Sequence, residues 1–113
     1  MEIGARSYAF SVAILKFVKA TNVDRLFSSL FDQLVRSSTS VGANVAEAKS
    51  ASSRKDFIRF YEYSLKSANE TKYWLALLKD ALGADAQTID TLLKEVTEIS
   101  KILAASIIKL KRN

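Results

Sequence analysis

The chain contains no proline, and this absence most narrowly limits how its 113 residues can fold. Proline ends or kinks a helix, because it lacks an amide donor and clashes with the preceding turn. Only three residues are glycine and 49% are apolar, which favours long uninterrupted helices. We therefore expect an all-α protein with one domain, residues 1–113, since this length supports a single core.

Polar breaks divide the chain into four expected helices, at about residues 4–20, 24–49, 54–82 and 86–112. Capping side chains stand before three of them: Asn22 or Asp24, then Ser53 with Asp56 three residues on, then Asp85. Gly83 suits the left-handed position after the third helix. Because the connections are short, consecutive helices should run antiparallel, which gives an up-down-up-down four-helix bundle.

Each expected helix carries an apolar stripe for the core when it is plotted at 100° per residue. The stripes contain Ile3, Phe10, Ile14 and Phe17; Phe27, Leu30, Phe31, Leu34, Val41 and Val45; Phe57, Phe60, Leu75, Leu78 and Leu82; and Ile89, Leu92, Val96, Ile99, Leu103, Ile107 and Leu110. The second and third stripes thin to small residues halfway: Ser38, Gly42, Ser64, Ser67, Ala68 and Thr71. Small side chains let helices approach closely, so we expect tight packing between the second and third helices there.

The helices carry more apolar surface than one core can bury. The surplus residues are Tyr8, Val12 and Leu15 on the first helix, Tyr63, Trp74 and Leu77 on the third, and Ile102 on the fourth. Exposed apolar patches mark association surfaces, and large aromatic residues anchor interfaces. We expect these residues to form subunit contacts in a homo-oligomer; the alternative is that Trp74 and Tyr8 only widen the edge of the core.

The chain carries 17 basic and 12 acidic residues, a net charge of +5. Such an excess favours polyanion binding, with nucleic acid as the leading candidate. The candidate binding residues are Arg54, Lys55, Arg59, Lys66, Lys109, Lys111 and Arg112. Contacts would go to phosphates, because no base-reading motif is present. The alternative is a solvated basic surface, and the basic tail of the fourth helix also suits the negative end of its dipole.

Catalysis lacks its commonest side chains, because the chain has neither histidine nor cysteine. No glycine-rich phosphate loop exists either. We therefore expect a protein that is not an enzyme and has no catalytic residues, metal site or cofactor. A polar row of Arg36, Ser40, Asn44 and Glu47 follows one side of the second helix. Glu70 could pair with an arginine from a neighbouring helix or subunit, and the alternative is a solvated face.

No apolar run approaches the roughly 20 residues that cross a membrane. The opening residues, Met1-Glu2-Ile3-Gly4, contain no basic segment before a long apolar stretch, so no secretory signal is evident. We therefore expect a cytoplasmic protein without membrane contact.

Two blocks of the sequence resemble a known family. Residues 34–48, LVRSSTSVGANVAEA, resemble L-x-R-S-x-T-S-I-G-A-N-I-x-E-A, the signature of the bacterial 23S rRNA intervening-sequence proteins. Residues 55–58, KDFI, and 64–75, SLKSANETKYWL, resemble the D-F-I and A-L-K-E-A-x-E-T-x-Y-W-L of the same family. Ser64 stands where alanine is usual and Ser67 where glutamate is usual, so a family role for that glutamate would be missing here.

The resemblance implies a closed, cylinder-like homo-oligomer, a pentamer. The family is similar to the accessory proteins of diversity-generating retroelements, which associate with a reverse transcriptase and bind nucleic acid. Its ribosomal label describes gene location more than ribosome membership. We expect a non-enzymatic oligomeric bundle that binds RNA or DNA through phosphate contacts. The alternative is a protein-binding scaffold, or an accessory subunit of a nucleic-acid-handling protein, without direct nucleic-acid contact.

Overall fold

Helices make up nearly all of the computed structural model, which describes residues 1–83 and 85–112. Its elements are α1 (Ile3–Ala20), the 3-10 turn η1 (Arg25–Phe27), α2 (Ser28–Lys49), α3 (Arg54–Leu82) and α4 (Ala86–Arg112). No strand occurs within these two ranges. The expectation of an all-α chain with four long helices is confirmed.

The ends of α3 are set by the residues that the sequence singled out. The Ser53 side chain accepts a hydrogen bond from the Asp56 amide at 3.1 Å, which satisfies one of the free donors of the first turn. Gly83 has a φ of 63° and donates its amide to the Lys79 carbonyl at 3.0 Å. Glycine adopts this left-handed conformation without a steric penalty, so it ends the helix cheaply. Both capping predictions are confirmed.

The second expected helix starts differently from the prediction. The Asp24 carboxylate accepts from the Leu26 amide at 2.9 Å, but the turn that it caps is η1, and α2 begins only at Ser28. Tighter 3-10 turns are common where a helix begins, because the first amides have no helical partner. Asp85 caps α4 as expected, accepting from the Thr88 amide at 3.3 Å.

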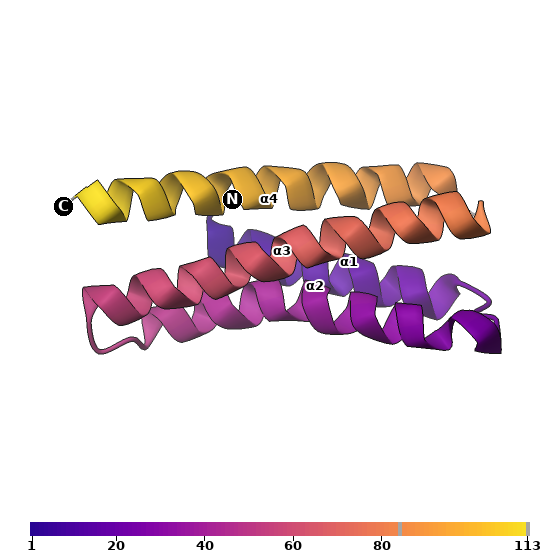
Figure 1. Ribbon diagram of the computed structural model, residues 1–113, viewed down its shortest axis with the longest axis horizontal. Coiled ribbons are helices and arrows are strands. Elements are labelled where there is room, and N and C mark those ends of the chain that lie inside the picture. Colours follow the sequence, from indigo (N-terminus) through magenta and orange to yellow (C-terminus); the bar gives the residue numbers. More distant parts are fainter. Residues whose placement is uncertain (84, 113) are drawn as a thin grey trace.

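The four helices lie side by side in a body 47 Å long and 21 by 20 Å across (Figure 1). Figure 1 shows the chain reversing its direction at each connection. Within the described residues α1 packs beside α2 and α4, and α3 packs beside the same two helices, whereas α1 and α3 lie diagonally across the core. The pair α1 and α2 and the pair α3 and α4 therefore form opposite sides of the molecule.

One core runs along the whole body and takes residues from all four helices. Its buried apolar members are Phe10, Ile14, Phe17, Phe31, Leu34, Val41, Val45, Ala48, Tyr61, Ala68, Leu75, Leu78, Ile89, Leu92, Val96, Ile99, Leu103 and Ile107. The expected stripes supply nearly all of this core, and the remaining stripe residues that pack against it are partly buried. Tyr61 was not expected in the core; it is buried and stacks on Phe57 with ring centroids 4.7 Å apart.

Small hydroxyl residues join α2 to α3 at mid-length. The buried Ser64 hydroxyl donates to the Val41 carbonyl at 2.7 Å, and the Thr71 hydroxyl lies 2.9 Å from that of Ser37. These distances require the close approach of α2 and α3 that the small residues predict. These hydrogen bonds also satisfy hydroxyl and carbonyl groups whose burial without partners would lower stability.

Gly42 belongs to a different contact from the one expected. A Cβ atom at Gly42 would lie 3.5 Å from the backbone and Cβ of Ser7, so this glycine faces α1 and not α3. The assignment of Gly42 to the contact between α2 and α3 was wrong, because a helical plot does not say which neighbouring helix each side of a helix meets.

The effect of a substitution at Gly42 on the free energy of unfolding should therefore change sign with the size of the new side chain. We expect Gly42→Ala to raise the free energy of unfolding by up to about 1 kcal/mol, because 3.5 Å leaves room for a methyl group and alanine favours helix. Gly42→Leu should lower it by about 1–3 kcal/mol, since α1 must move away. Urea unfolding followed by circular dichroism measures both, and a stabilising leucine would contradict the contact.

The burial of Tyr61 makes the stability of the fold sensitive to high pH. Loss of water around Tyr61 raises the pKa of its phenol, and the nearby Glu2 carboxylate adds to the rise. The unfolded chain then releases this proton first, so stability is full below a pH of about 10 and falls as pH rises through the folded pKa. We expect Tyr61→Phe to flatten the pH dependence of the unfolding midpoint above pH 10; an unchanged dependence would contradict this assignment.

One ion pair ties α1 to α4. The Nε and Nη2 atoms of Arg6 bind the two carboxylate oxygens of Glu95 at 2.8 and 2.9 Å, and this hydrogen bonding raises the pKa of the arginine further. The two residues stand 89 positions apart, so no local sequence pattern marks the pair. Because the ion pair is bidentate, it fixes which side of α4 faces α1.

Candidate nucleic-acid interface

The ends of three helices meet at one end of the molecule. Helix α2 ends there, α3 begins there and α4 ends there (Figure 1, left). A hollow of about 390 Å³ at this end is lined by residues from all three, among them Lys49, Arg54, Phe57 and Leu110. The fold therefore gathers basic residues that the sequence spreads over more than 60 positions.

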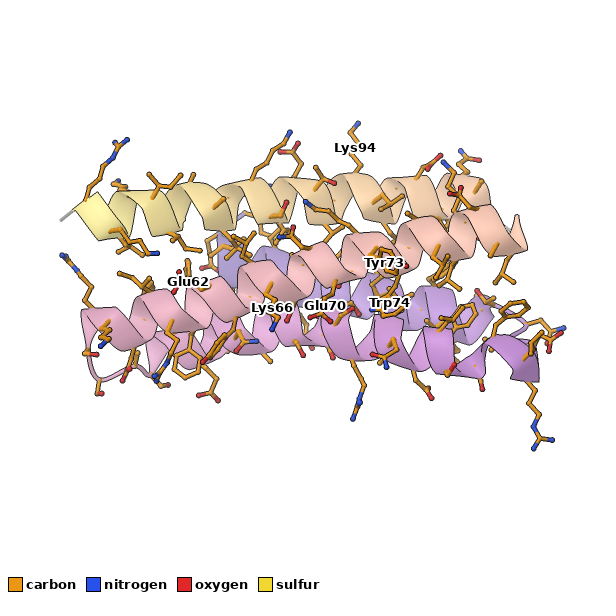
Figure 2. All side chains as sticks on the ribbon, viewed as in Figure 1. Glu62, Lys66, Glu70, Tyr73, Trp74 and Lys94 are labelled. Atoms are coloured by element: carbon orange, nitrogen blue, oxygen red, sulfur yellow. The ribbon has the colours of Figure 1, made fainter. Side chains whose placement is uncertain are left out.

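We call this surface the basic end. It consists of Lys49, Arg54, Lys55, Arg59, Lys109, Lys111 and Arg112, all of which are exposed. Six of these are residues expected from the sequence. Lys49 was missed, although its place in the last turn before a short connection marks it as a neighbour of Arg54. Lys66 stands apart, since Figure 2 shows it well inside α3, away from the end where α3 begins.

Acidic neighbours offset part of this charge. Lys111 lies 2.9 Å from Glu62, Arg59 lies 3.0 Å from Asp56, and Lys49 lies 3.7 Å from Glu2. Water reaches all of these side chains and weakens each pair, so a phosphate can compete for the cation.

The balance of charge at this end stays positive. Seven cations stand against four carboxylates, those of Glu2, Glu47, Asp56 and Glu62, which leaves three positive charges out of +5 for the whole chain. More than half of the net charge therefore lies at one end, where it can act on a single ligand.

The polar row of α2 is held by the helix itself. The Ser40 hydroxyl donates to the Arg36 carbonyl at 2.7 Å, and the Asn44 amide donates to the Ser40 carbonyl at 2.9 Å. Glu47 is exposed at the C-terminal end of the row. Within the part of the chain that the structure describes, no ion pair joins Glu70 to an arginine; Glu70 lines a groove between α3 and α4 instead.

The expected subunit-contact residues do not share one surface. Tyr8, Leu15 and Tyr63 are exposed, whereas Val12, Trp74, Leu77 and Ile102 are half-buried. Ile102 lies two turns from Glu95, on the side of α4 that faces α1, whereas Trp74 packs against the core from α3. These residues thus face different sides of the molecule. Tyr73 was not among the expected contacts, although it is 62% exposed.

Metal binding and membrane crossing find no support in the described residues. Among residues 1–83 and 85–112, no three carboxylates come close enough together to hold a metal ion. None of the helices in these ranges has the length and apolar character that crossing a membrane requires.

The fold and this surface define a class of protein: a small, basic, all-helical bundle with its cations concentrated at one end. The family can also be named, since the family model described as 23S rRNA-intervening sequence protein matches residues 1–105. The chain belongs to this family, and the resemblance seen in the sequence is confirmed.

A solved structure supports the assignment. A protein of unknown function from the S23 ribosomal protein family of Bacteroides thetaiotaomicron is 34% identical to this chain, with a TM-score of 0.83. The match covers 94% of this chain and 98% of that one. No curated protein matches the chain.

Proposed function

We propose that the chain is a non-enzymatic subunit of a closed homo-oligomer that binds nucleic-acid phosphates through its basic end. The observation that supports this proposal is that Lys49 and Arg54 line one hollow together with Leu110. The exposed cations Lys109, Lys111 and Arg112 stand in the last turn of α4, next to Leu110. Phosphate contacts supply most of the sequence-independent affinity for nucleic acids, and arginine and lysine make them.

A ring of subunits strengthens this surface. In a cyclic assembly every up-down-up-down bundle has the same orientation, so all basic ends lie on one rim. Three positive charges bind a polyanion weakly, but five copies in the pentamer that we propose would act together on one strand. Linked weak sites gain affinity because later contacts form within the complex, without a new encounter.

Direct binding can be tested with fluorescently labelled single-stranded RNA and double-stranded DNA. We expect anisotropy to rise on addition of the protein at about 50 mM salt, with log K falling linearly against log salt by roughly 0.7 per phosphate contacted on a single strand. An absence of binding to either probe at this salt concentration, where phosphate contacts are strongest, would rule out direct nucleic-acid binding.

The proposed homo-oligomer can be tested separately, by measuring the mass of the assembly. Light scattering at micromolar concentration should give a mass that is a multiple of 12.5 kDa, and five times this value for the proposed pentamer. A mass of 12.5 kDa would overturn the assembly while leaving the binding experiment to decide the function of a single bundle.

A further inference from the structure

The hollow at the basic end has an apolar surface that phosphate binding does not use. Ala48 from α2, Phe57 from α3 and Leu110 from α4 provide this surface, within a volume of about 390 Å³. Lys49 and Arg54 line the same hollow. An apolar surface with cations beside it matches a ligand that carries an apolar part and a negative charge in one molecule.

The Phe57 ring is held in place from the core. It stacks on the Tyr61 ring, with centroids 4.7 Å apart and 29° between the ring planes. Tyr61 is buried, whereas Phe57 is half-buried and lines the hollow. Aromatic rings favour offset stacking, so a further flat ring lying on Phe57 would extend a stack that already has two members.

The shape and the polar groups of the hollow suit a nucleobase. The hollow is open to solvent and does not enclose a ligand, but a planar base needs only one apolar surface to lie on. Ser52 and Ser53 add hydroxyls for the hydrogen-bonding edge of the base. The Ser53 hydroxyl accepts a hydrogen bond from the Asp56 amide at 3.1 Å, and a hydroxyl can donate its own proton at the same time.

The charges beside the hollow suit the phosphates that a base carries with it. The Asp56 carboxylate lies 3.0 Å from Arg59 and accepts a hydrogen bond from Ser52 at 3.3 Å, so neighbouring groups offset its charge. Lys49 and Arg54 are both exposed at the hollow. A base bound there would bring its own sugar-phosphate groups to these two cations.

We infer that the hollow binds an unpaired nucleotide of a single-stranded nucleic acid, with its base on Phe57 and Leu110 and its phosphates at the neighbouring cations. This inference rests on the nucleic-acid binding proposed above and names the class of ligand. Bases inside a duplex stack on one another, so they present no free face to the hollow. Stacking on an aromatic ring tolerates any base, which agrees with the lack of a base-reading motif.

Fluorescence anisotropy can separate the base from the phosphates. The probes are labelled oligo-dT and oligo-U of about 12 nucleotides and an abasic deoxyribose-phosphate strand of the same length. All three carry the same number of phosphates. We expect both strands with bases to bind about tenfold more tightly than the abasic strand at about 50 mM salt, with similar slopes of log K against log salt.

Equal affinity for the strands with and without bases would overturn this inference and leave phosphate binding at the basic end. No binding of any strand would overturn the proposed function as well. Tighter binding of only one of oligo-dT and oligo-U would support stacking and identify the strand as DNA or RNA. Circular single-stranded DNA should also compete better, per nucleotide, than a double-stranded circle of the same sequence; the reverse order would overturn the preference for unpaired bases.

Substitutions at Phe57 test the ring itself. Phe57→Leu keeps an apolar side chain without a ring, so it should weaken binding of oligo-dT about tenfold and leave the abasic strand unaffected. Phe57→Tyr keeps the ring and should bind like the natural chain. Phe27→Leu is the matched control, because Phe27 is also half-buried but precedes the start of α2, at the other end of the molecule. Equal weakening of both strands by Phe57→Leu would show that the ring acts only through the fold, and would overturn the inference.

Photo-cross-linking locates the base directly. An oligo-dT with one 5-iodouracil is irradiated in the complex, and the protein is then digested with trypsin and analysed by mass spectrometry. Cleavage after Lys55 and Arg59 releases residues 56–59, in which Phe57 is the only aromatic residue. We expect the adduct on this peptide. Adducts confined to peptides that do not line the hollow, such as the one that contains Tyr73, would overturn the site while leaving nucleic-acid binding in place.

Discussion

Leu75→Ala is expected to lower the free energy of unfolding by about 2–5 kcal/mol, a large share of the roughly 5–15 kcal/mol that keeps a typical domain folded. Leu75 is fully buried in the core on α3. The truncation removes apolar contacts and leaves a cavity that two long helices fill only partly, because the hydrogen bonds between Ser64 and Val41 and between Thr71 and Ser37 hold α2 and α3 close together.

The measurement is urea unfolding followed by the fluorescence of Trp74, the only tryptophan and the neighbour of Leu75 in sequence. Leu75→Met keeps the volume and should cost less than about 1.5 kcal/mol. Leu26→Ala, at a strongly exposed position, should change stability by less than about 0.5 kcal/mol. A decrease below about 1 kcal/mol for Leu75→Ala would contradict a tightly packed core at this point.

Local signals in the sequence predict most of the fold. Ser53 and Gly83 mark the ends of α3 because a cap depends on residues within one turn. The apolar stripes predict the core because the 3.6-residue repeat places Leu34, Leu75 and Ile99 on inward faces. The start of α2 escaped prediction because a 3-10 turn and an α-helix accept the same capping residue, Asp24.

Contacts between helices could not be predicted in the same way. A helical plot separates the sides of one helix but does not say which neighbour each side meets. This is why Gly42 was placed against α3 although it faces α1, and why the pairing of Arg6 with Glu95 escaped notice.

The arrangement of the candidate site could not be predicted from the sequence either, because it depends on contacts between helices. The sequence identified the charges of residues 54–59 and 109–112, but their convergence follows only from the antiparallel arrangement of α3 and α4. The same arrangement adds Lys49 and separates Lys66 from the others. The helical plot selected Trp74 for subunit contacts, although its neighbour Tyr73 is the more exposed of the two.

Reversing two charges at the basic end should weaken nucleic-acid binding about 100-fold at about 0.1 M salt. The variant Lys55→Glu with Arg112→Glu leaves the ion pairs of Lys49, Arg59 and Lys111 in place. Each reversal removes an attraction to phosphate and adds a repulsion, and the ring proposed above would repeat this effect in every subunit. The slope of log K against log salt should become shallower by about one for each phosphate that the variant no longer binds.

The decisive comparison is with a variant of equal net charge. Lys16→Glu with Lys94→Glu also changes four charge units, but at positions away from the basic end; Figure 2 shows Lys94 pointing outward from α4. If binding depends on the basic end, this control should weaken binding by less than about tenfold, because charges farther apart than a Debye length of about 10 Å are screened at 0.1 M salt. Equal weakening in the two variants would show that the overall charge drives binding and that the convergence of α2, α3 and α4 plays no part in it.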